Sequence, residues 1–549
     1  MDISLFLFVG FSCFLLINGN KVEDCGYLTD KTSFQSFQVL LQAEQPYRTA
    51  YHFQSPRNWM NGPMQYKGVY HLFYQYNPNS AWFGDGMVWA HSASYDLINW
   101  FGLDHALVPS KPFDAISCIS GSATILPGDK PVILYTVEWV KYSGNPLMTP
   151  PDGVNGDNFR YPTTAWQGPD GTWKVVIGSY SNNQGMAILY KSQDFIHWTM
   201  HQDPLYSSSK TEMWVCPDFF PVSINDTNGV DTSIENPSVR HVMKASFNSH
   251  DVYIVGTYVN EQERFLPDAD FTGTSSDLRF DYGKFYASKS FFDSKKNRRI
   301  LCAWVNESDS MEDDLKKGWS GLQNHTDPQS QWFMDNPLHK QLVQWPVEEL
   351  NSLRDNEVYV YGKQLESGSI FEVSGITASQ FIDTSLVDPQ LICDKQDASV
   401  TEKFRPFGLL ALATMDLTEQ TAIFFRVFRD HKDYKVLMCS DQKRSSLRNE
   451  LDKTTYGAFV DIDPQREMVS LRTLIDHSII ESFGGKGRSV ITTRVYPELA
   501  INDEAHLFAF NNGSLSVKVS RLNAWSMNKA QITAGGKTET LSEDFSRKK

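Results

Sequence analysis

Short β-type segments follow one another along most of this chain, and no helical period of apolar residues persists among them. The segments are rich in β-branched and aromatic residues and are separated by turn-forming residues, which is typical of strands. Examples lie at 69–76, 132–135, 173–178 and 299–304. This pattern predicts an all-β protein.

The organisation of these segments indicates two domains, because 549 residues are too many for one ordinary core. The pattern Asp-apolar-Ile-X-Trp occurs at 96–100 and again at 194–198, and recurrence at this interval favours radial repetition. Strands resume beyond a short helical linker, which favours a β-sandwich. The predicted parts are a propeller domain at 45–346, a linker at 347–363, a sandwich at 364–527 and a polar tail at 528–549, of which we expect residues 535–549 to be disordered.

The N-terminus predicts secretion. Residues 1–20 form a signal peptide with an apolar run from Ile3 to Leu16, although Asp2 stands where a positive charge is usual. An uncleaved anchor is the alternative, and no other stretch resembles a membrane span. A net charge of −15 argues against binding to nucleic acid and against ionic adhesion to acidic wall polymers.

Cysteines and sequons fit an extracellular protein. No pair of the seven cysteines has metal-site spacing, so we expect neither a metal nor another cofactor. Four Asn-X-Ser/Thr sequons are candidate glycosylation sites. They begin at Asn225, Asn306, Asn324 and Asn512.

Three segments resemble the catalytic motifs of glycoside hydrolase family 32, the plant cell-wall invertases and fructan exohydrolases. They read N-W-M-N-G-P at 58–63, F-R-Y-P at 159–162 and M-W-V-C-P at 213–217. The family motifs are W-M-N-D-P-N-G with an Asp nucleophile, F-R-D-P with a transition-state-stabilising Asp, and W-E-C-P with a Glu acid/base. This chain lacks Asp-Pro-Asn between Asn61 and Gly62, and has Tyr161 and Val215 in place of Asp and Glu.

The resemblance extends over about residues 45–525, through segments such as Y-H-F-Q, F-D-Y-G-K-F-Y-A-S-K and D-H-S-I-I-E-S-F. It implies a five-bladed β-propeller with the active site on its axis, followed by a β-sandwich. It also implies a disulfide between Cys393 and Cys439, with two free buried thiols as the alternative. The family acts on sucrose and fructans, so such sugars are the expected ligands, and the sequence does not identify any protein partner.

The three replacements predict that hydrolysis is lost. Retaining hydrolysis needs a nucleophilic carboxylate and a carboxylic acid roughly 5–5.5 Å apart, and valine has no proton to donate. Tyr161 could act as the nucleophile, as tyrosine does in sialidases. In plant members a very small exon encodes the missing triplet, so altered splicing could omit it, but that does not explain Tyr161 or Val215. Displaced carboxylates are a further alternative, with Asp218 expected to be structural; the candidates are Asp85, Asp157, Glu212 and Asp218.

Part of the family's sugar site persists, which leaves three interpretations open. The favoured one is a secreted invertase-like protein that binds sucrose or fructan ends without hydrolysing them. The others are an active β-fructofuranosidase with displaced acids and a drifted protein without a sugar role, in which the matching residues serve only packing. The candidate sugar-contacting residues are Trp59, Asn61, Gln75, Trp82, Ser120 and Arg160.

Overall fold

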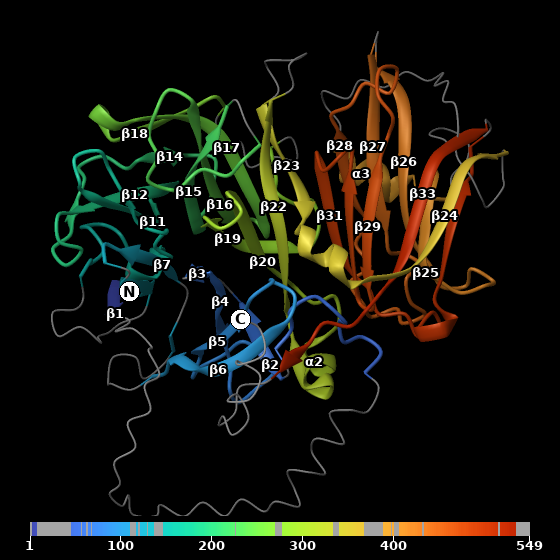
Figure 1. Cartoon of the computed structure of the whole chain (residues 1–549), viewed down its shortest axis with the longest axis horizontal. Coiled ribbons are helices and arrows are strands. Elements are labelled where there is room, and N and C mark those ends of the chain that lie inside the picture. Colours follow the sequence, from blue (N-terminus) through green and yellow to red (C-terminus); the bar gives the residue numbers. More distant parts are fainter. Residues whose placement is uncertain are drawn as a thin grey trace, which may run out of the picture.

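The computed structural model describes residues 3–7 and 45–533, apart from gaps within the second range. The gaps are residues 56, 62–63, 67, 110–116, 119–120, 129, 137–146, 225–226, 270–276, 333–339, 367–387, 397, 400–405, 431–432 and 514–515. The described residues form two all-β domains that lie side by side (Figure 1).

The N-terminal domain consists of five sheets that follow one another in sequence. The first contains β2 (Asn58–Asn61), β3 (Met64–Tyr66), β4 (Val69–Tyr76), β5 (Val88–Ser94) and β6 (Trp100–Leu107). The second contains β7 (Gly121–Leu126), β8 (Lys130–Thr136) and β1 (Ile3–Leu7). The third contains β9 (Phe159–Arg160), β10 (Trp166–Gln167), β11 (Trp173–Ser181), β12 (Gln184–Ser192), β13 (Thr199–Met200) and β14 (Tyr206–Ser208).

The remaining two sheets complete the domain. The fourth contains β15 (Val215–Ser223), β16 (Val239–Phe247), β17 (His250–Val259) and β18 (Arg264–Pro267). The fifth contains β19 (Phe285–Asp293), β20 (Arg298–Val305), β22 (Leu322–Trp332) and β23 (Lys340–Pro346). After β20 the chain forms α2 (Met311–Lys317) and β21 (Trp319–Ser320), and β21 pairs in parallel with β2 of the first sheet.

Five hydrophobic clusters join the sheets into a closed ring. Each cluster is shared by two neighbouring sheets, and the last one joins the fifth sheet to the first. Large aromatic side chains fill these wedge-shaped interfaces, which accounts for the aromatic content of 13%. The five-bladed propeller is therefore confirmed. In order around the ring, each interface contains residues from both of its sheets. Examples, one residue from each sheet, are Trp89 and Tyr135, Leu134 and Val175, Trp166 and Phe219, Phe220 and Leu301, and Tyr70 and Phe291.

The C-terminal domain is the expected β-sandwich. A five-stranded sheet packs against a three-stranded one through clusters that include Phe425, Ile423, Ile480 and Ile491. The larger sheet contains β25 (Phe407–Ala413), β26 (Thr421–Asp430), β27 (Asp433–Asp441), β28 (Tyr456–Val460) and β32 (His506–Asn511). The smaller contains β29 (Leu471–Asp476), β30 (Ile479–Gly484) and β31 (Ser489–Arg494). Among the described residues, no helix has the length and apolar character needed to cross a membrane.

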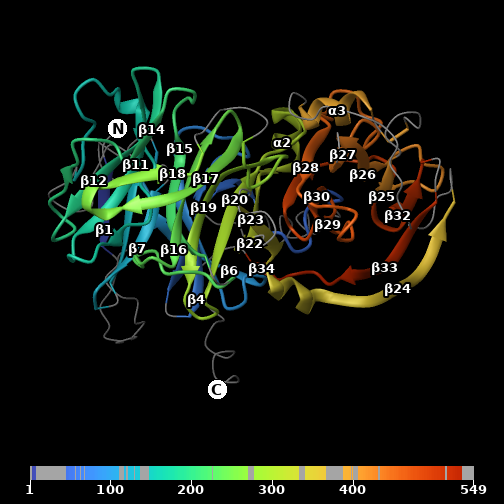
Figure 2. The same ribbon diagram turned by 90° about the horizontal axis from the view of Figure 1, so that it is seen from above.

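The domain boundaries differ in detail from the prediction. The linker predicted at 347–363 holds a short 3-10 helix, η3 (Glu348–Leu353), and most of β24 (Arg354–Leu365). β24 pairs with β33 (Val517–Met527), and the two strands run together along the outside of the C-terminal domain (Figure 2). The segment predicted as a polar tail contains β34 (Ile532–Thr533), which pairs with β6 of the propeller. Residues 534–549 lie outside the described part.

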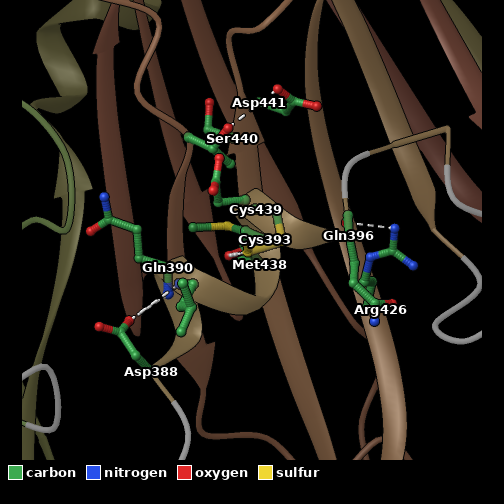
Figure 3. The surroundings of a disulfide bond; sticks show 12 residues. Asp388, Gln390, Cys393, Gln396, Arg426, Met438, Cys439, Ser440 and Asp441 are labelled. Atoms are coloured by element: carbon green, nitrogen blue, oxygen red, sulfur yellow. Dashed lines mark hydrogen bonds between the residues drawn. A yellow bond between two sulfur atoms is a disulfide. The ribbon is translucent and has the colours of Figure 1, made fainter.

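The disulfide implied by the resemblance is present. Cys393 of α3 (Pro389–Lys395) bonds Cys439 of β27, and both residues are fully buried (Figure 3). The Asp388 side chain caps α3 by accepting hydrogen bonds from Gln390 N and Leu391 N. The disulfide therefore attaches α3 to the centre of the larger sheet, and the alternative of two free thiols is wrong.

Removing this disulfide is expected to destabilise the protein. The double variant Cys393→Ala, Cys439→Ala loses a cross-link over 46 residues, which typically costs about 2–4 kcal/mol of unfolding free energy. Urea denaturation followed by fluorescence measures this loss. The variant Cys302→Ala, which changes a buried free thiol, is the control without a cross-link; equal losses in the two variants would contradict a cross-linking role.

A buried histidine joins the two domains. His52, from the start of the propeller, places Nδ1 2.8 Å from Oδ2 of Asp476 and Nε2 2.7 Å from Oε2 of Glu481, both in the sandwich. Burial alone would lower the pKa of His52, but the two carboxylates raise it to about 9. His52 is therefore charged at neutral pH and holds an ion triad across the domain interface.

This triad predicts that stability falls at alkaline pH. A histidine whose pKa is raised on folding stabilises the native state fully below its unfolded pKa of about 6.5, and this contribution disappears as the pH rises through 9. We expect the free energy of unfolding of the natural protein, measured by urea denaturation, to fall between about pH 6.5 and about pH 9. In His52→Gln this fall should be smaller. His197→Gln, at an exposed histidine, is the control, and its free energy of unfolding should fall with pH as much as that of the natural protein.

Candidate functional site

A cavity of about 480 Å³ lies where all five propeller sheets meet. We call it the axial cavity and define it by Gln75, Trp89, strand β7, Cys216 and Lys289 on its wall. Because every residue of β7 contributes to the lining, the cavity follows the propeller axis. Its volume is within the range of about 300–1,000 Å³ that is usual for small-molecule sites.

The first motif lies in β2. The strand contains Trp59 and Asn61, and Asn61 is the register partner of Gln75 in β4. Gln75 is buried and lines the axial cavity, so the chain brings these two predicted residues together. Gly62, where the Asp-Pro-Asn triplet is missing, lies outside the described residues.

The second motif turns sharply at Tyr161. This residue has φ 64°, in the left-handed region that Asp and Asn enter far more readily than Tyr. Arg160 Nε donates to the carbonyl oxygen of Asp157 at 2.6 Å, and its guanidinium lies 5.7 Å from the Tyr161 ring. Burial raises the pKa of Tyr161 to about 12, so the phenol is neutral at physiological pH. Tyr161 therefore supplies no anion.

The third motif begins β15 at Val215. Trp214 is fully buried and its indole donates to Thr211 Oγ1 at 2.8 Å. A Cβ atom at Gly178 of β11 would lie 2.0 Å from the Trp214 carbonyl oxygen, so only glycine lets the two strands approach this closely. Cys216 has φ 45° and lines the axial cavity, and burial raises the pKa of its thiol. This thiol is therefore protonated.

Two lysines support the second and third motifs. Lys289 Nζ donates to the carbonyl oxygens of Pro162 at 3.1 Å and of Pro217 at 2.7 Å, and so connects the two motifs. Lys244 Nζ donates to the Cys216 carbonyl oxygen at 3.1 Å and pairs with Asp251 at 3.0 Å. Sequence reasoning did not select either lysine. The only available signal was that Lys289 lies in the segment F-D-Y-G-K-F-Y-A-S-K.

The candidate displaced carboxylates have different surroundings. Asp218 is buried and its Oδ2 accepts a hydrogen bond from Ser290 N at 2.8 Å, as a structural residue would. Asp85, Asp157 and Glu212 are exposed. Burial and then the charges of other groups raise the pKa of Tyr286, and Glu212 adds to this rise. Burial raises the pKa of Cys216, and Asp218 adds to that rise in the same way. None of the four lines the axial cavity among the described residues.

The other predicted sugar contacts are spread around the site. Trp82 is 47% exposed on the loop between β4 and β5, where Asn77 Nδ2 donates to its carbonyl oxygen at 2.7 Å. Neither Trp82 nor Arg160 lines the axial cavity in the described part of the chain. Ser120 lies outside the described residues, and the side chains of Trp59 and Asn61 are not described. Their contact with sugar stays a prediction.

The glycosylation predictions have mixed outcomes. Asn306 is exposed, whereas Asn512 is half-buried and donates to the Ala398 carbonyl oxygen at 2.8 Å. The prediction for Asn324 is wrong, because its side chain in β22 is 1% exposed and leaves no room for a glycan. Asn225 lies outside the described residues.

Comparisons with known proteins define the class of the chain. Residues 52–138 and 136–346 match the glycosyl hydrolases family 32 N-terminal domain, and residues 349–526 match the glycosyl hydrolases family 32 C-terminal domain. Because these matches cover most of its length, the chain belongs to glycosyl hydrolase family 32.

Plant proteins are among the relatives that this chain resembles. Beta-fructofuranosidase, insoluble isoenzyme CWINV6, from Arabidopsis thaliana is 51% identical over 90% of this chain and 98% of the relative. Fructan 6-exohydrolase from Beta vulgaris is 48% identical over 90% of this chain and 89% of the relative. The crystal structure of fructan 1-exohydrolase IIa from Cichorium intybus matches with a TM-score of 0.85 and 52% identity, over 90% of this chain and 99% of that one. A variant of that enzyme has been solved in complex with 1-kestose.

Proposed function

We propose that this family 32 protein is secreted to the cell wall, binds the fructosyl end of sucrose or a fructan, and does not hydrolyse it. The observation that carries the proposal is the pair Tyr161 and Val215 at the two motifs that Lys289 holds together. Val215 has no proton to donate, and the Tyr161 phenol is neutral at physiological pH, so neither side chain supplies the carboxylate that the family chemistry uses.

Three arguments support the absence of hydrolysis. The Tyr161 phenol is neutral, and burial keeps the Cys216 thiol next to Val215 protonated as well. Lys289 and Lys244 are not carboxylates, so they cannot supply the pair of carboxyl groups that retaining hydrolysis uses. Asp218 accepts a backbone hydrogen bond and does not line the axial cavity.

The support for sugar binding comes from the cavity and from the relatives. Gln75 and the aromatic side chains of Phe73 and Trp89 line the axial cavity, which gives it the amide and aromatic surfaces that sugars contact. The Cichorium intybus relative, at 52% identity, was solved with 1-kestose. We therefore take sucrose and 1-kestose as the ligands to test.

Hydrolysis by a displaced carboxylate is the second candidate function. The names of the relatives favour it, because they are β-fructofuranosidases and fructan exohydrolases. Glu212 is the carboxylate to examine, since it is exposed and acts electrostatically on Tyr286 beside the motifs. If the natural protein releases fructose and Glu212→Gln abolishes that release, this candidate replaces the first.

Thermal unfolding with sucrose and with 1-kestose tests the proposed binding. A ligand at 100 times its dissociation constant stabilises the folded protein by about 2.7 kcal/mol, so the melting temperature should rise with sugar concentration. Gln75→Leu should reduce that rise, while Gln193→Leu, at an exposed glutamine just after β12 and outside the axial cavity, should not. No stabilisation by either sugar would reject the binding function.

A further inference from the structure

The second propeller sheet is completed by a strand from the far N-terminus of the chain, β1, which lies beside β8 on the outer side of the propeller (Figure 1). Among the described residues, only β7 and β8 of this sheet come from the propeller region, whereas each of the other four sheets has at least four strands. The match to the family 32 N-terminal domain is also split at the end of β8, into residues 52–138 and 136–346. We propose that the outer edge of β8 is a strand-acceptor site, which binds an extended apolar segment of another protein after the N-terminus has been removed.

The pairing in the structure shows which kind of segment fits this site. β1 pairs antiparallel with β8 over five successive residues, from Ile3 opposite Thr136 to Leu7 opposite Val132. The sequence of β1 is I-S-L-F-L, which contains four apolar residues and no charge. An uncharged, mostly apolar segment in extended conformation is therefore the chemistry that we assign to the partner.

The backbone edge is the part of β8 that a partner can bind. The side chains of Ile133 and Tyr135 pack toward the first sheet, and those of Val132 and Leu134 pack toward the third. All four are buried. The N–H and C=O groups on the edge of a strand need partners, and a peptide that adds a further strand supplies them. Recognition at this site therefore depends on main-chain hydrogen bonds.

Secretion takes β1 away from this edge. The inference rests on the secretion in the proposed function, because removal of the predicted signal peptide, residues 1–20, also removes β1. β7 lines the axial cavity, so β8 is the second strand outward, and the neighbouring sheets contain more strands. The edge of β8 is therefore set back between two wider sheets, where an extended segment fits more readily than the edge of a second folded copy.

Binding of a synthetic peptide to the secreted chain tests this inference. The probe is the natural segment 2–9, labelled for fluorescence anisotropy. Its matched control carries Leu5→Pro and Phe6→Pro, because neighbouring residues of a strand direct their N–H groups to opposite edges and one of the two must face β8. We expect the natural peptide to bind about tenfold more tightly than the control, or better. Equal binding of the two peptides, or no binding, overturns the inference.

A cysteine trap tests the register of the added strand. Mass spectrometry under oxidising conditions measures disulfide formation between the peptide with Ile3→Cys and the secreted variant Thr136→Cys. Lys130→Cys, at the other end of β8, is the control, and the natural chain is the blank. Because residue 3 lies opposite residue 136, we expect about tenfold more disulfide with Thr136→Cys than with the control. Equal formation in the two variants contradicts the proposed site.

Two further measurements on the secreted chain identify the occupant. Mass spectrometry of its N-terminus should show that residues 1–20 are absent, since their presence would fill the edge from within the same chain and overturns the inference. Light scattering should show a monomer. A dimer that the peptide dissociates would make a second copy the occupant and overturns the assignment to another protein. If sucrose or 1-kestose binds but the peptide does not, the inference fails and the proposed function stands.

Discussion

Restoring the three family motifs is expected to create hydrolysis of sucrose. The repaired variant carries Asp-Pro-Asn after Asn61, together with Tyr161→Asp and Val215→Glu. General acid/base catalysis alone contributes about 10²–10⁴-fold, and the nucleophile opens the covalent route. We therefore expect fructose release at least ~10⁴-fold faster than with the natural chain, measured by enzymatic fructose assay at about pH 5.

The partly repaired variants test the same account. Val215→Glu alone supplies an acid/base without a nucleophile, so it should stay inactive, and so should Tyr161→Asp alone. Residues that act as one catalytic unit are strongly non-additive, and activity should appear only when nucleophile and acid/base are both present. If the repaired variant folds but has no activity, the scaffold has changed at positions outside the three motifs.

Removing Glu307 is expected to cause a large loss of stability. Glu307 lies in the propeller after β20, and its Oε1 accepts hydrogen bonds from Arg494 Nη1 and Gly321 N, each at 2.7 Å. Its Oε2 accepts from Tyr496 and lies 3.2 Å from Lys317 Nζ. Glu307→Ala leaves the buried Arg494 without its carboxylate, and breaking a buried ion pair in this way typically costs about 3–5 kcal/mol. Urea denaturation measures this loss.

The contribution of Glu307 to stability is expected to depend on pH, and a surface ion pair provides a control. Burial opposes ionisation of Glu307, but Arg494 and Lys317 lower its pKa to about 2. Its stabilising contribution is therefore present above the unfolded pKa of about 4.5 and is lost as the pH falls through 2. Glu312→Ala removes an exposed pair with Lys316 and should cost at most about 1 kcal/mol. Similar losses in both variants would mean that Glu307 does not hold the domains together.

The fold could be predicted from sequence because its signals are local and redundant. Strand segments recur along the chain, and family motifs cover about residues 45–525. The partnership of His52 with Asp476 could not be predicted, because more than 400 residues separate them and only the packing of two domains brings them together. The burial of Asn324 was also hidden, since a sequon carries no information about the strand that contains it.

Prediction of the candidate site was limited for a related reason. The replaced positions Tyr161 and Val215 could be read directly from their motifs. Lys289 could not be selected, because its role depends on closure of the propeller ring, which brings β19 against the Pro162 and Pro217 carbonyl groups. Neither could the left-handed backbone at Tyr161 be anticipated, because tyrosine rarely adopts it.

Fructose release from sucrose by the natural protein tests the central claim most directly. The purified secreted chain is incubated with sucrose at about pH 5, beside the repaired variant as a positive control and a buffer blank. The proposed function predicts release by the repaired variant and none above the blank by the natural chain. Release by the natural chain that Glu212→Gln removes would contradict it and show that a displaced carboxylate performs the reaction.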